Sequence, residues 1–342
     1  MERINIVVVG LHFGRCMLES NMIDGPGAAY IKVTGVCDLN APLAAELAQK
    51  YGVRAYASLN EVLADPTVPA VALFTGPIGR AKLVEKIIRA GKDVMTTKPF
   101  ELDPEAALAV LRLAKSLGRV VHLNSPNPLL PADLTQMSQW HTEFKLGRPI
   151  AANFQVWCSY REPADNSWYD DWDRCPVAPI FRLGIYALND IVYFLGEPES
   201  VQVTHSRIFT GRPTPDNGIL TIRFQNGALA SVFASFCISG DFPYANTTTF
   251  NFEHGSIFRN VGPHVDSKAG RLELVTGGPA AVITRVAKPE GEWSGGYQWA
   301  NFQRALSGEK LAGEISPEQI VAAVRIIAAM AKAQHSGRTE MV

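Results

Sequence analysis

The chain has 342 residues, of which 47% are hydrophobic and 19% charged, and its 32 Lys and Arg residues nearly balance 33 Asp and Glu residues. This length exceeds what one hydrophobic core usually supports, so we expect two domains. The balanced charge provides no general attraction to nucleic acid or to an anionic membrane. The sequence has neither a long apolar run nor a secretory signal, which predicts a cytoplasmic protein without a membrane span.

The cysteines and histidines form no recognisable disulfide or metal pattern. The cysteine count is odd and includes no Cys-x-x-Cys pair, and the seven histidines lack His-x-x-x-His spacing. We therefore expect free thiols and no bound metal. The cysteines are Cys16, Cys37, Cys158, Cys175 and Cys237.

Residues 1–124 alternate between short β-branched runs and amphipathic segments, which is typical of a parallel sheet covered by helices on both faces. The expected strands are 4–9, 30–37, 68–75, 93–96 and 119–123, and the expected helices are 16–21, 43–51, 59–64, 81–90 and 104–117. Asn, Ser and Pro accumulate at 124–128, so we place the domain boundary there and expect a first domain of 1–124.

A glycine turn follows the first strand, in the order strand, turn and helix that a dinucleotide site requires. The turn departs from Gly-x-Gly-x-x-Gly, because His12 occupies the second glycine position and Gly14 arrives one residue early. We still expect Gly10, His12, Phe13 and Gly14 to contact the cofactor.

Asp38 ends the second strand, where a carboxylate can accept both ribose hydroxyls of NAD and repel the extra phosphate of NADP. Leu39 after it supplies no cation for that phosphate. NAD is therefore the expected cofactor, with NADP disfavoured. The alternative is that Asp38 is only a strand-end or helix-capping carboxylate.

Two further loops follow strands at the carboxyl edge, where ligands of open α/β sheets bind. Thr75, Gly76 and Pro77 form the first, and we assign them to the cofactor site. Lys98 lies in the second, after residues 93–96, and is a candidate both for chemistry and for contact with the cofactor.

The second half, 125–342, contains strand-like runs joined by tight turns, including the hairpin signal Asn226-Gly227. This pattern predicts an α+β domain with an antiparallel sheet and a helix over 182–195 on one face. The expected strands are 151–160, 201–209, 218–224, 229–238, 247–253 and 272–275, and the other expected helices are 133–143, 297–306 and 317–334.

The helix over 182–195 carries polar groups that a purely structural helix would not need. Arg182, Tyr186 and Asn189 fall at i, i+4 and i+7, which places them on one face. The alternative is an ordinary helix with surface polar residues.

These motifs, Gly10 to Gly14, Asp38, Thr97-Lys98-Pro99 and Gly184-Ile185-Tyr186, resemble the family of glucose-fructose oxidoreductase, inositol dehydrogenase and MocA. The resemblance spans nearly the whole chain. It implies an N-terminal Rossmann domain that binds a nicotinamide cofactor. It also implies a C-terminal domain, built on a large open antiparallel sheet, that supplies part of the substrate site and often an oligomer interface. A homodimer or homotetramer is therefore expected.

The chain departs from the family pattern at several polar positions. Thr97 replaces the Glu of the usual Glu-Lys-Pro, and Arg80 stands where a His is common. The family's Asp-x-Gly-x-His-x-x-Asp motif maps onto Arg182, Gly184, Tyr186 and Asn189. A Tyr in place of the His resembles the glucose-fructose oxidoreductase branch, whereas Arg182 replaces a carboxylate with a cation.

The resemblance implies hydride transfer between NAD and a hydroxyl carbon of a sugar, cyclitol or sugar-acid-like substrate. Lys98 would polarise the substrate oxygen and favour the phenolate of Tyr186, the expected acid/base. Arg182 suggests a substrate carboxylate or phosphate. Its alternative is an ion pair with Asp170, Asp171 or Asp173. The other expected substrate-binding residues are Asn189, Trp168, Arg161 and Asn124.

Two other functional classes remain open on the sequence. Some relatives use transient oxidation to drive elimination or glycoside cleavage, so the chain could be an NAD-using lyase or glycosidase. It could also be a non-catalytic regulator that binds NAD and sugar, because the motif has lost its Asp and His. The retention of Lys98 and Tyr186 favours an enzyme.

Overall fold

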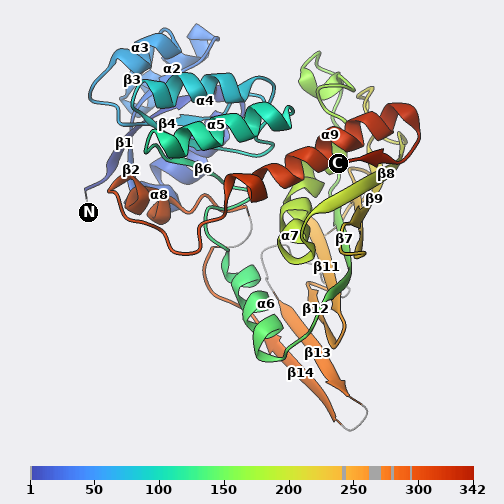
Figure 1. The fold of residues 1–342 in the computed structure, drawn as a ribbon. Helices are drawn as coiled ribbons and strands as arrows, with labels where there is room; N and C mark the ends of the chain where they lie inside the picture. The colour runs from blue at the N-terminus through green and yellow to red at the C-terminus, as the bar shows by residue number, and fades with distance from the viewer. Residues whose placement is uncertain (1, 241–243, 262–270, 279–280, 293–294) are drawn as a thin grey trace. The chain divides into compact units, whose positions relative to one another are not determined.

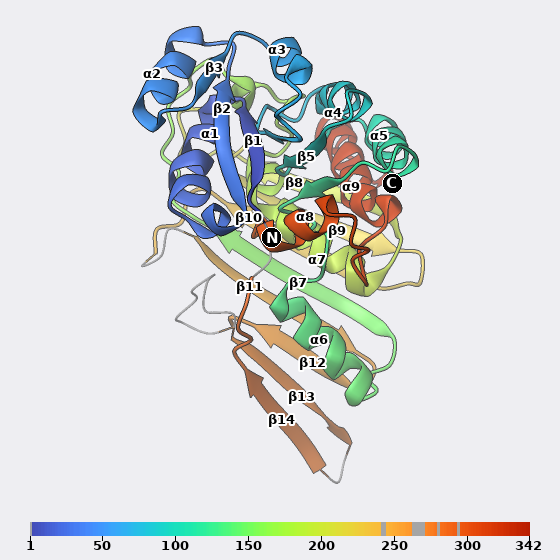
Figure 2. The same ribbon diagram turned by 90° about the vertical axis from the view of Figure 1, so that its left-hand side faces the viewer.

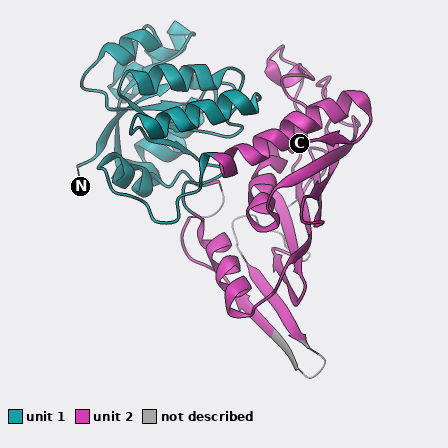
Figure 3. Ribbon diagram, in the orientation of Figure 1, with its two compact units in different colours: residues 1–129, 296–317 teal, residues 130–295, 318–342 magenta. Residues whose placement is uncertain are grey.

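The computed structural model describes residues 2–240, 244–261, 271–278, 281–292 and 295–342, which divide into two compact units (Figure 3). Unit 1 comprises Met1–Leu129 and Gly296–Pro317, and unit 2 comprises Leu130–Gly295 and Glu318–Val342. The boundary expected after residue 124 lies close to the first passage between the units. The segment Gly296–Pro317, which we expected in the second domain, belongs to unit 1.

Unit 1 contains a six-stranded parallel sheet with the order β3-β2-β1-β4-β5-β6 (Figures 1 and 2). Chain order reverses between β1 and β4, and such a switch point is where open α/β sheets bind ligands. The strands are β1 Ile4–Val9, β2 Ile31–Cys37, β3 Arg54–Tyr56, β4 Ala70–Leu73, β5 Asp93–Thr96 and β6 Val121–Leu123.

Helices cover both faces of this sheet, which explains why its strands lack polar alternation. In β1, Ile6 and Val7 point to opposite faces, and both are fully buried. The helices of unit 1 are α1 Leu11–Met17, a π-helical turn η1 Leu18–Ile23, a 3-10 turn η2 Pro26–Ala29, α2 Ala41–Tyr51, α3 Leu59–Ala64, α4 Arg80–Arg89, α5 Pro104–Ser116 and α8 Trp299–Leu306.

Two side chains cap helices at positions that the sequence predicts as helix starts. Ser58 accepts from the Glu61 amide at 3.3 Å and Asp103 from the Glu105 amide at 2.9 Å, so α3 and α5 begin at the positions that the sequence predicts. Each cap satisfies a backbone donor that a helix N-terminus otherwise leaves without a partner.

The late helix α8 completes the core of unit 1. Trp299 is 1% exposed and joins the apolar cluster that contains Ile6 and Leu47, and its indole nitrogen donates to Asn21. The Gln303 amide donates to the Glu2 carbonyl at 2.8 Å. The core of the N-terminal sheet therefore requires residues from near the end of the chain.

Unit 2 contains a nine-stranded sheet with the order β14-β13-β12-β11-β7-β10-β9-β8-β15. The expected antiparallel pattern holds for its described pairings except that of β7 with β10, which run parallel. The chain passes through helices and the β8-β9 hairpin after β7, and this long connection lets β10 return in the same direction. The strands are β7 Pro149–Trp157, β8 Pro198–Ser206, β9 Asn217–Phe224, β10 Leu229–Ser235, β11 Ala245–Phe252, β12 Gly255–Arg259, β13 Leu272–Gly278, β14 Ala281–Ala287 and β15 Glu340–Met341.

The two faces of this sheet differ in cover. Helix α7 packs against one face of β10, where Ala230 and Val232 are buried. Leu229, the first residue of the strand, is 56% exposed. Ile219 on the neighbouring strand β9 is 47% exposed. No described helix is long and apolar enough to cross a bilayer. The helices of unit 2 are α6 Ala132–Glu143, a 3-10 turn η3 Trp168–Asp170, a π-helical turn η4 Ile180–Gly184, α7 Ile185–Leu195 and α9 Pro317–Ser336.

A buried ion cluster fixes α6 and α7 to the sheet. The Arg259 guanidinium on β12 donates to Asp133 of α6 at 2.6 Å and to Asp190 of α7 at 2.9 Å. Its side chain and both carboxylates are at most 9% exposed. Such a cluster is costly to disrupt, because removing one charge leaves the others buried without compensation.

We predict that Arg259→Met destabilises the protein by about 3–5 kcal/mol, since two buried carboxylates lose their shared cation. Chemical denaturation would measure this change. Arg223→Met is the matched control, because Arg223 lies on β9 with its side chain 62% exposed and pairs with Glu199 on the surface. Equal stability of the two variants would contradict the role assigned to the cluster.

Candidate functional site

Gly10 links β1 directly to α1. Its φ is +88°, and a Cβ at this position would lie 2.9 Å from the backbone carbon of Phe74, so only glycine fits between β1 and the end of β4. The helix begins at Leu11 and not near residue 16 as expected, because the turn is a single residue. Gly14 is buried in α1, with its missing Cβ 3.2 Å from Val8. It therefore provides the close helix-strand packing expected of the third glycine.

The other two expected residues of the turn lie in the first turn of α1. His12 is exposed, and Phe13 is 41% exposed with its ring edge-to-face against Phe74 at a centroid distance of 5.9 Å. Amides in the first turn of a helix lack intrahelical partners and face outward along the axis. The structure thus brings His12 and Phe13 to the switch point between β1 and β4.

Asp38 follows β2 and touches the same turn. One carboxylate oxygen accepts from the Leu11 amide at 2.5 Å and the other from the Asn40 amide at 2.7 Å. Asp38 therefore has the capping contacts that were its alternative interpretation. Each carboxylate oxygen has a further lone pair, so these contacts leave capacity for ribose hydroxyls. Leu39 beside it is fully exposed.

Lys98 lies in the loop after β5 and is partly exposed, whereas both neighbours, Thr97 and Pro99, are buried. The Lys98–Pro99 peptide bond is cis. The Asn124 side-chain oxygen accepts from the Lys98 amide at 2.9 Å and from the Thr97 hydroxyl at 3.2 Å. Asn124, which we expected to bind substrate, thus braces the backbone of Lys98.

The loop Thr75, Gly76 and Pro77 follows β4, next to β5. The Thr75 carbonyl accepts from the buried guanidinium of Arg80, and the Pro77 carbonyl accepts from the Arg80 amide at 3.3 Å. In unit 1, the expected cofactor residues and Lys98 therefore gather on loops that follow β1, β2, β4 and β5.

Arg182, Tyr186 and Asn189 lie in unit 2, on η4 and α7, which together we call the motif helix. Between 181 and 190 every residue is buried except Arg182, Tyr186 and Asn189, which are partly exposed. Tyr186 and Asn189 belong to α7, and Arg182 belongs to the π-helical turn before it. Single π-helical turns often occur at functional sites.

Arg182 forms a two-pronged ion pair with Glu162. Its two terminal nitrogens each donate to a different oxygen of that carboxylate at 2.8 Å. The guanidinium carbon also lies 4.2 Å from the Tyr169 ring centre and 5.0 Å from that of Tyr160. An ion pair with the preceding loop was one of the two expected roles, but the acid is Glu162 and not Asp170, Asp171 or Asp173.

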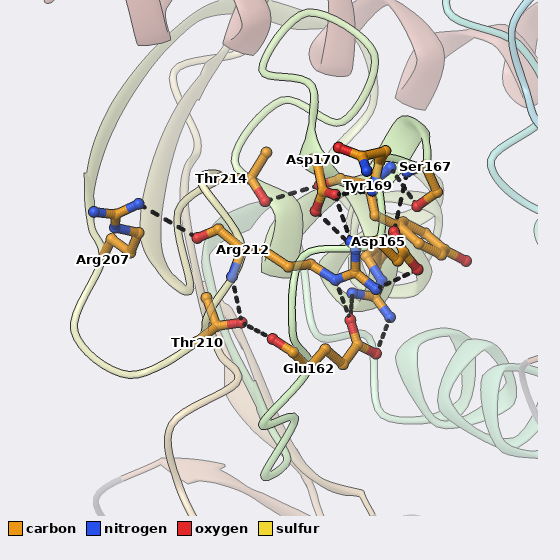
Figure 4. Close-up of polar contacts among 11 residues, drawn as sticks. Glu162, Asp165, Ser167, Tyr169, Asp170, Arg207, Thr210, Arg212 and Thr214 are labelled. Carbon is orange, nitrogen blue, oxygen red and sulfur yellow. Dashed lines mark hydrogen bonds and ion pairs between the residues drawn. The ribbon is translucent and has the colours of Figure 1, made fainter.

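A second arginine extends this pair into a cluster (Figure 4). The guanidinium of Arg212 donates to Glu162 at 2.8 Å, Asp165 at 2.7 Å and Asp170 at 2.8 Å. Its side chain is 8% exposed. These contacts tie the loop of residues 160–170 to the loop after β8 and to the motif helix. The described residues contain no group of three His, Cys, Asp or Glu side chains placed to hold a metal ion.

The remaining expected substrate residues lie at different places around this loop. The Arg161 guanidinium carbon lies 4.0 Å from the centre of the Phe209 ring. Trp168 packs against Tyr169 at a centroid distance of 4.1 Å and edge-to-face against Phe181 at 6.1 Å. Trp168 therefore lies with the motif helix, whereas Arg161 lies with the loop after β8.

Several residues with strong contacts escaped the sequence interpretation. Glu162 directly follows Arg161, a predicted substrate residue, so its negative charge near Arg182 in the sequence was the available signal. No signal in the sequence pointed to Arg212, because its partner Glu162 lies 50 positions away along the chain. Arg80 was noted only as a departure from the family pattern.

Comparison with known families accords with this geometry. Residues 4–125 match the model described as "Oxidoreductase family, NAD-binding Rossmann fold". Residues 134–258 match the "GFO/IDH/MocA C-terminal domain". The chain belongs to the Gfo/Idh/MocA family, and the resemblance, the fold class and the NAD cofactor expected from the sequence are confirmed.

Individual relatives are distant. The chain is 25% identical over 209 residues to 1,5-anhydro-D-fructose reductase of Ensifer adhaerens, which covers 60% of this chain and 62% of the relative. This is less than two thirds of that relative's length. Galactose 1-dehydrogenase of Pseudomonas fluorescens is 24% identical over 277 residues, covering 79% and 81%. The crystal structure of GenD2 from gentamicin A biosynthesis, in complex with NAD, has a TM-score of 0.76 at 20% identity and covers 100% and 97%.

We predict that acid loosens the loop of residues 160–170. Burial alone would raise the pKa of Glu162, but hydrogen bonds and charges from Arg182 and Arg212 outweigh it and lower that pKa. A depressed carboxyl pKa stabilises the folded state above the unfolded pKa, and this stabilisation is lost as the pH falls through the folded pKa. The near-ultraviolet circular dichroism of Trp168 and Tyr169 should therefore change below about pH 4.5, the ordinary pKa of a glutamic acid. An unchanged signal down to pH 3 would refute this prediction, and Arg212→Met should shift the change to higher pH.

Proposed function

We propose that the protein transfers hydride between NAD and a hydroxyl-bearing carbon of a sugar, a cyclitol or a related molecule. The observation that carries this proposal is Lys98. It is partly exposed at the carboxyl end of β5, and its amide is braced by buried Asn124 within an NAD-binding Rossmann sheet. When bound, NAD supplies the acceptor or donor of the hydride. The chain must then position the substrate and move one proton.

Lys98 and Tyr186 divide this work. The Lys98 ammonium polarises the substrate oxygen and stabilises negative charge that develops on it. Tyr186 exchanges the hydroxyl proton as the general acid or base. In support, Tyr186 is partly exposed on a helix whose neighbouring residues are buried and whose position is fixed by the Arg259 cluster. Asn189, three residues on, can donate to and accept from a substrate hydroxyl.

The charge around Arg182 favours an uncharged substrate. Arg182 and Arg212 together face three carboxylates, those of Glu162, Asp165 and Asp170. The cluster therefore carries no excess positive charge to attract a carboxylate or phosphate. This arrangement supports a neutral sugar or cyclitol over a sugar acid, with Arg182 ordering the loop that carries Trp168. The names of the two relatives, a reductase and a dehydrogenase of sugars, agree with that class.

The sheet of unit 2 supports the expected homodimer or homotetramer. Ile219 of β9 and Leu229 of β10 are each about half exposed, at positions that alternate with the buried residues of their strands. An open sheet face with exposed apolar side chains often contacts a second copy of the chain. Sedimentation of the purified protein would test this assembly.

The central prediction is that purified protein given NAD and a panel of neutral sugars, inositols and sugar acids forms NADH, detected by its absorbance. Lys98→Met or Tyr186→Phe should lower turnover by about 10²-fold or more, because each removes a group acting in proton transfer or charge stabilisation. NAD affinity should remain nearly unchanged. Full turnover in either variant would remove that residue from the mechanism.

The same panel separates the competing classes. Consumption of substrate without accumulation of NADH would indicate the lyase or glycosidase with transient oxidation. Binding of NAD without conversion of any sugar would indicate the regulator. Retention of both Lys98 and Tyr186 favours the oxidoreductase, since binding alone requires neither.

Asp38→Asn tests the preference for NAD over NADP. Asparagine retains one acceptor for the Leu11 amide, but it loses the charge that holds the ribose hydroxyls and repels a phosphate. We expect the dissociation constant for NAD to rise about 10-fold or more, as for a lost hydrogen bond to a charged group. NADP should bind no worse than it does to the parent protein. The measurement is titration of both cofactors by calorimetry, and an unchanged ratio of affinities would contradict the role.

A further inference from the structure

Arg80 is the first residue of α4, and its side chain is 1% exposed. One terminal nitrogen donates to the Thr97 carbonyl at 2.5 Å and also to that of Pro99, with the Phe100 carbonyl 3.4 Å away. The other terminal nitrogen donates to the Thr75 carbonyl. A single buried guanidinium therefore joins the loop after β4 to the loop after β5.

Helix stability does not explain a cation at this position. A positive charge at the N-terminus of a helix opposes the helix dipole, and burial of a charge is costly. Burial lowers the pKa of Arg80 to about 10, although the charge of Glu101 opposes that shift. The carboxylate of Glu101 is 3% exposed and accepts from the Gly79 and Ala81 amides, at 3.2 and 2.9 Å. The buried guanidinium of Arg80 is thus accompanied by the buried carboxylate of Glu101.

The carbonyls that Arg80 binds belong to the residues on either side of Lys98. Thr97 precedes Lys98 and Pro99 follows it, and the Lys98 amide itself donates to Asn124 at 2.9 Å. The backbone is therefore fixed before, at and after Lys98, while the Lys98 side chain remains partly exposed. A planar guanidinium can satisfy several carbonyls at once, which a lysine ammonium in its place would do less well.

We propose that Arg80 is a positioning residue for Lys98: by holding the carbonyls of Thr97, Pro99 and Thr75 together, it sets where the Lys98 ammonium stands relative to the substrate oxygen. This role rests on the proposed function of Lys98. Arg80 itself touches neither the substrate nor the reacting atoms. A displacement of about 1 Å in a reacting group can lower turnover about 10²-fold, so loss of Arg80 should act on turnover more than on cofactor binding.

The test is a double-mutant cycle with Arg80→Met, Lys98→Met and the double variant. Arg80→Met alone should lower kcat about 10²-fold and change the KM for NAD by less than about threefold. In the Lys98→Met background the same change should have almost no further effect, because the group that Arg80 positions is already missing. Independent, additive losses would overturn the proposal, as would a folded Arg80→Met protein with normal kcat.

Two further variants serve as a conservative replacement and as a control for this test. Arg80→Lys keeps the charge and some donors, so it should recover part of the lost turnover, and it replaces Arg80→Met in the cycle if that protein does not fold. Arg89→Met is the control on the same helix. Its side chain is 56% exposed and pairs only with Glu85 among the described ion pairs, so turnover should not change.

Hydrogen exchange provides a measurement that does not depend on activity. In Arg80→Met, amides of residues 97–102 should exchange faster than in the parent protein, whereas those of strand β5 should not. If the parent protein forms no NADH with any substrate, the proposed function fails, and the exchange result alone then decides whether Arg80 holds the loop. Unchanged exchange at 97–102 would refute the positioning role in either case.

Discussion

The guanidinium of Arg80 lies among backbone carbonyls at the ends of two parallel strands, and its place shows a constraint that governs the whole protein. Loops that follow buried strands carry polar backbone groups away from water, and each such group needs a partner. In unit 1 the partners are buried side chains: Arg80 for the carbonyls, and Glu101 and Asn124 for the amides. Buried side chains therefore hold the backbone of the loops that follow β4 and β5.

Unit 2 uses the same device with different residues. Asp216 is fully buried, and its carboxylate accepts from the amides of Phe209 and Thr210 at 2.6 and 2.8 Å, which fixes the loop after β8. Arg212 from that loop then holds Glu162, and Glu162 holds Arg182. The order of the loop of residues 160–170 thus depends on a series of polar contacts that begins at the buried carboxylate of Asp216. The charge of Arg182 is thus balanced within unit 2 by the carboxylate of Glu162.

Local signals in the sequence predicted some elements and missed others. Asp93–Thr96 and Leu59–Ala64 have the bounds that the apolar pattern predicts, whereas α1 begins at Leu11 and not near residue 16. The partner of Arg182 could not be found in this way, since several acids lie nearby in sequence and packing alone selects Glu162. The parallel pairing of β7 with β10 depends on the path of the intervening chain, which periodicity does not encode. The motifs that made the family recognisable lie after strands in unit 1 and on η4 and α7 in unit 2, whereas the roles of individual residues there remain proposals.

The place of α8 has a consequence for how the protein is made. Tyr297, Trp299 and Phe302 belong to the same apolar cluster as Ile6 and Ile31, so the first sheet cannot bury its core until residue 302 has left the ribosome. Contacts between such distant parts of a chain form slowly, because the loop between them must close first. During translation part of one face of the N-terminal sheet would stay uncovered while strands β7 to β14 of the second unit are synthesised. The unit that begins the chain is therefore completed late in synthesis, and this interval is when the nascent protein is most exposed to aggregation.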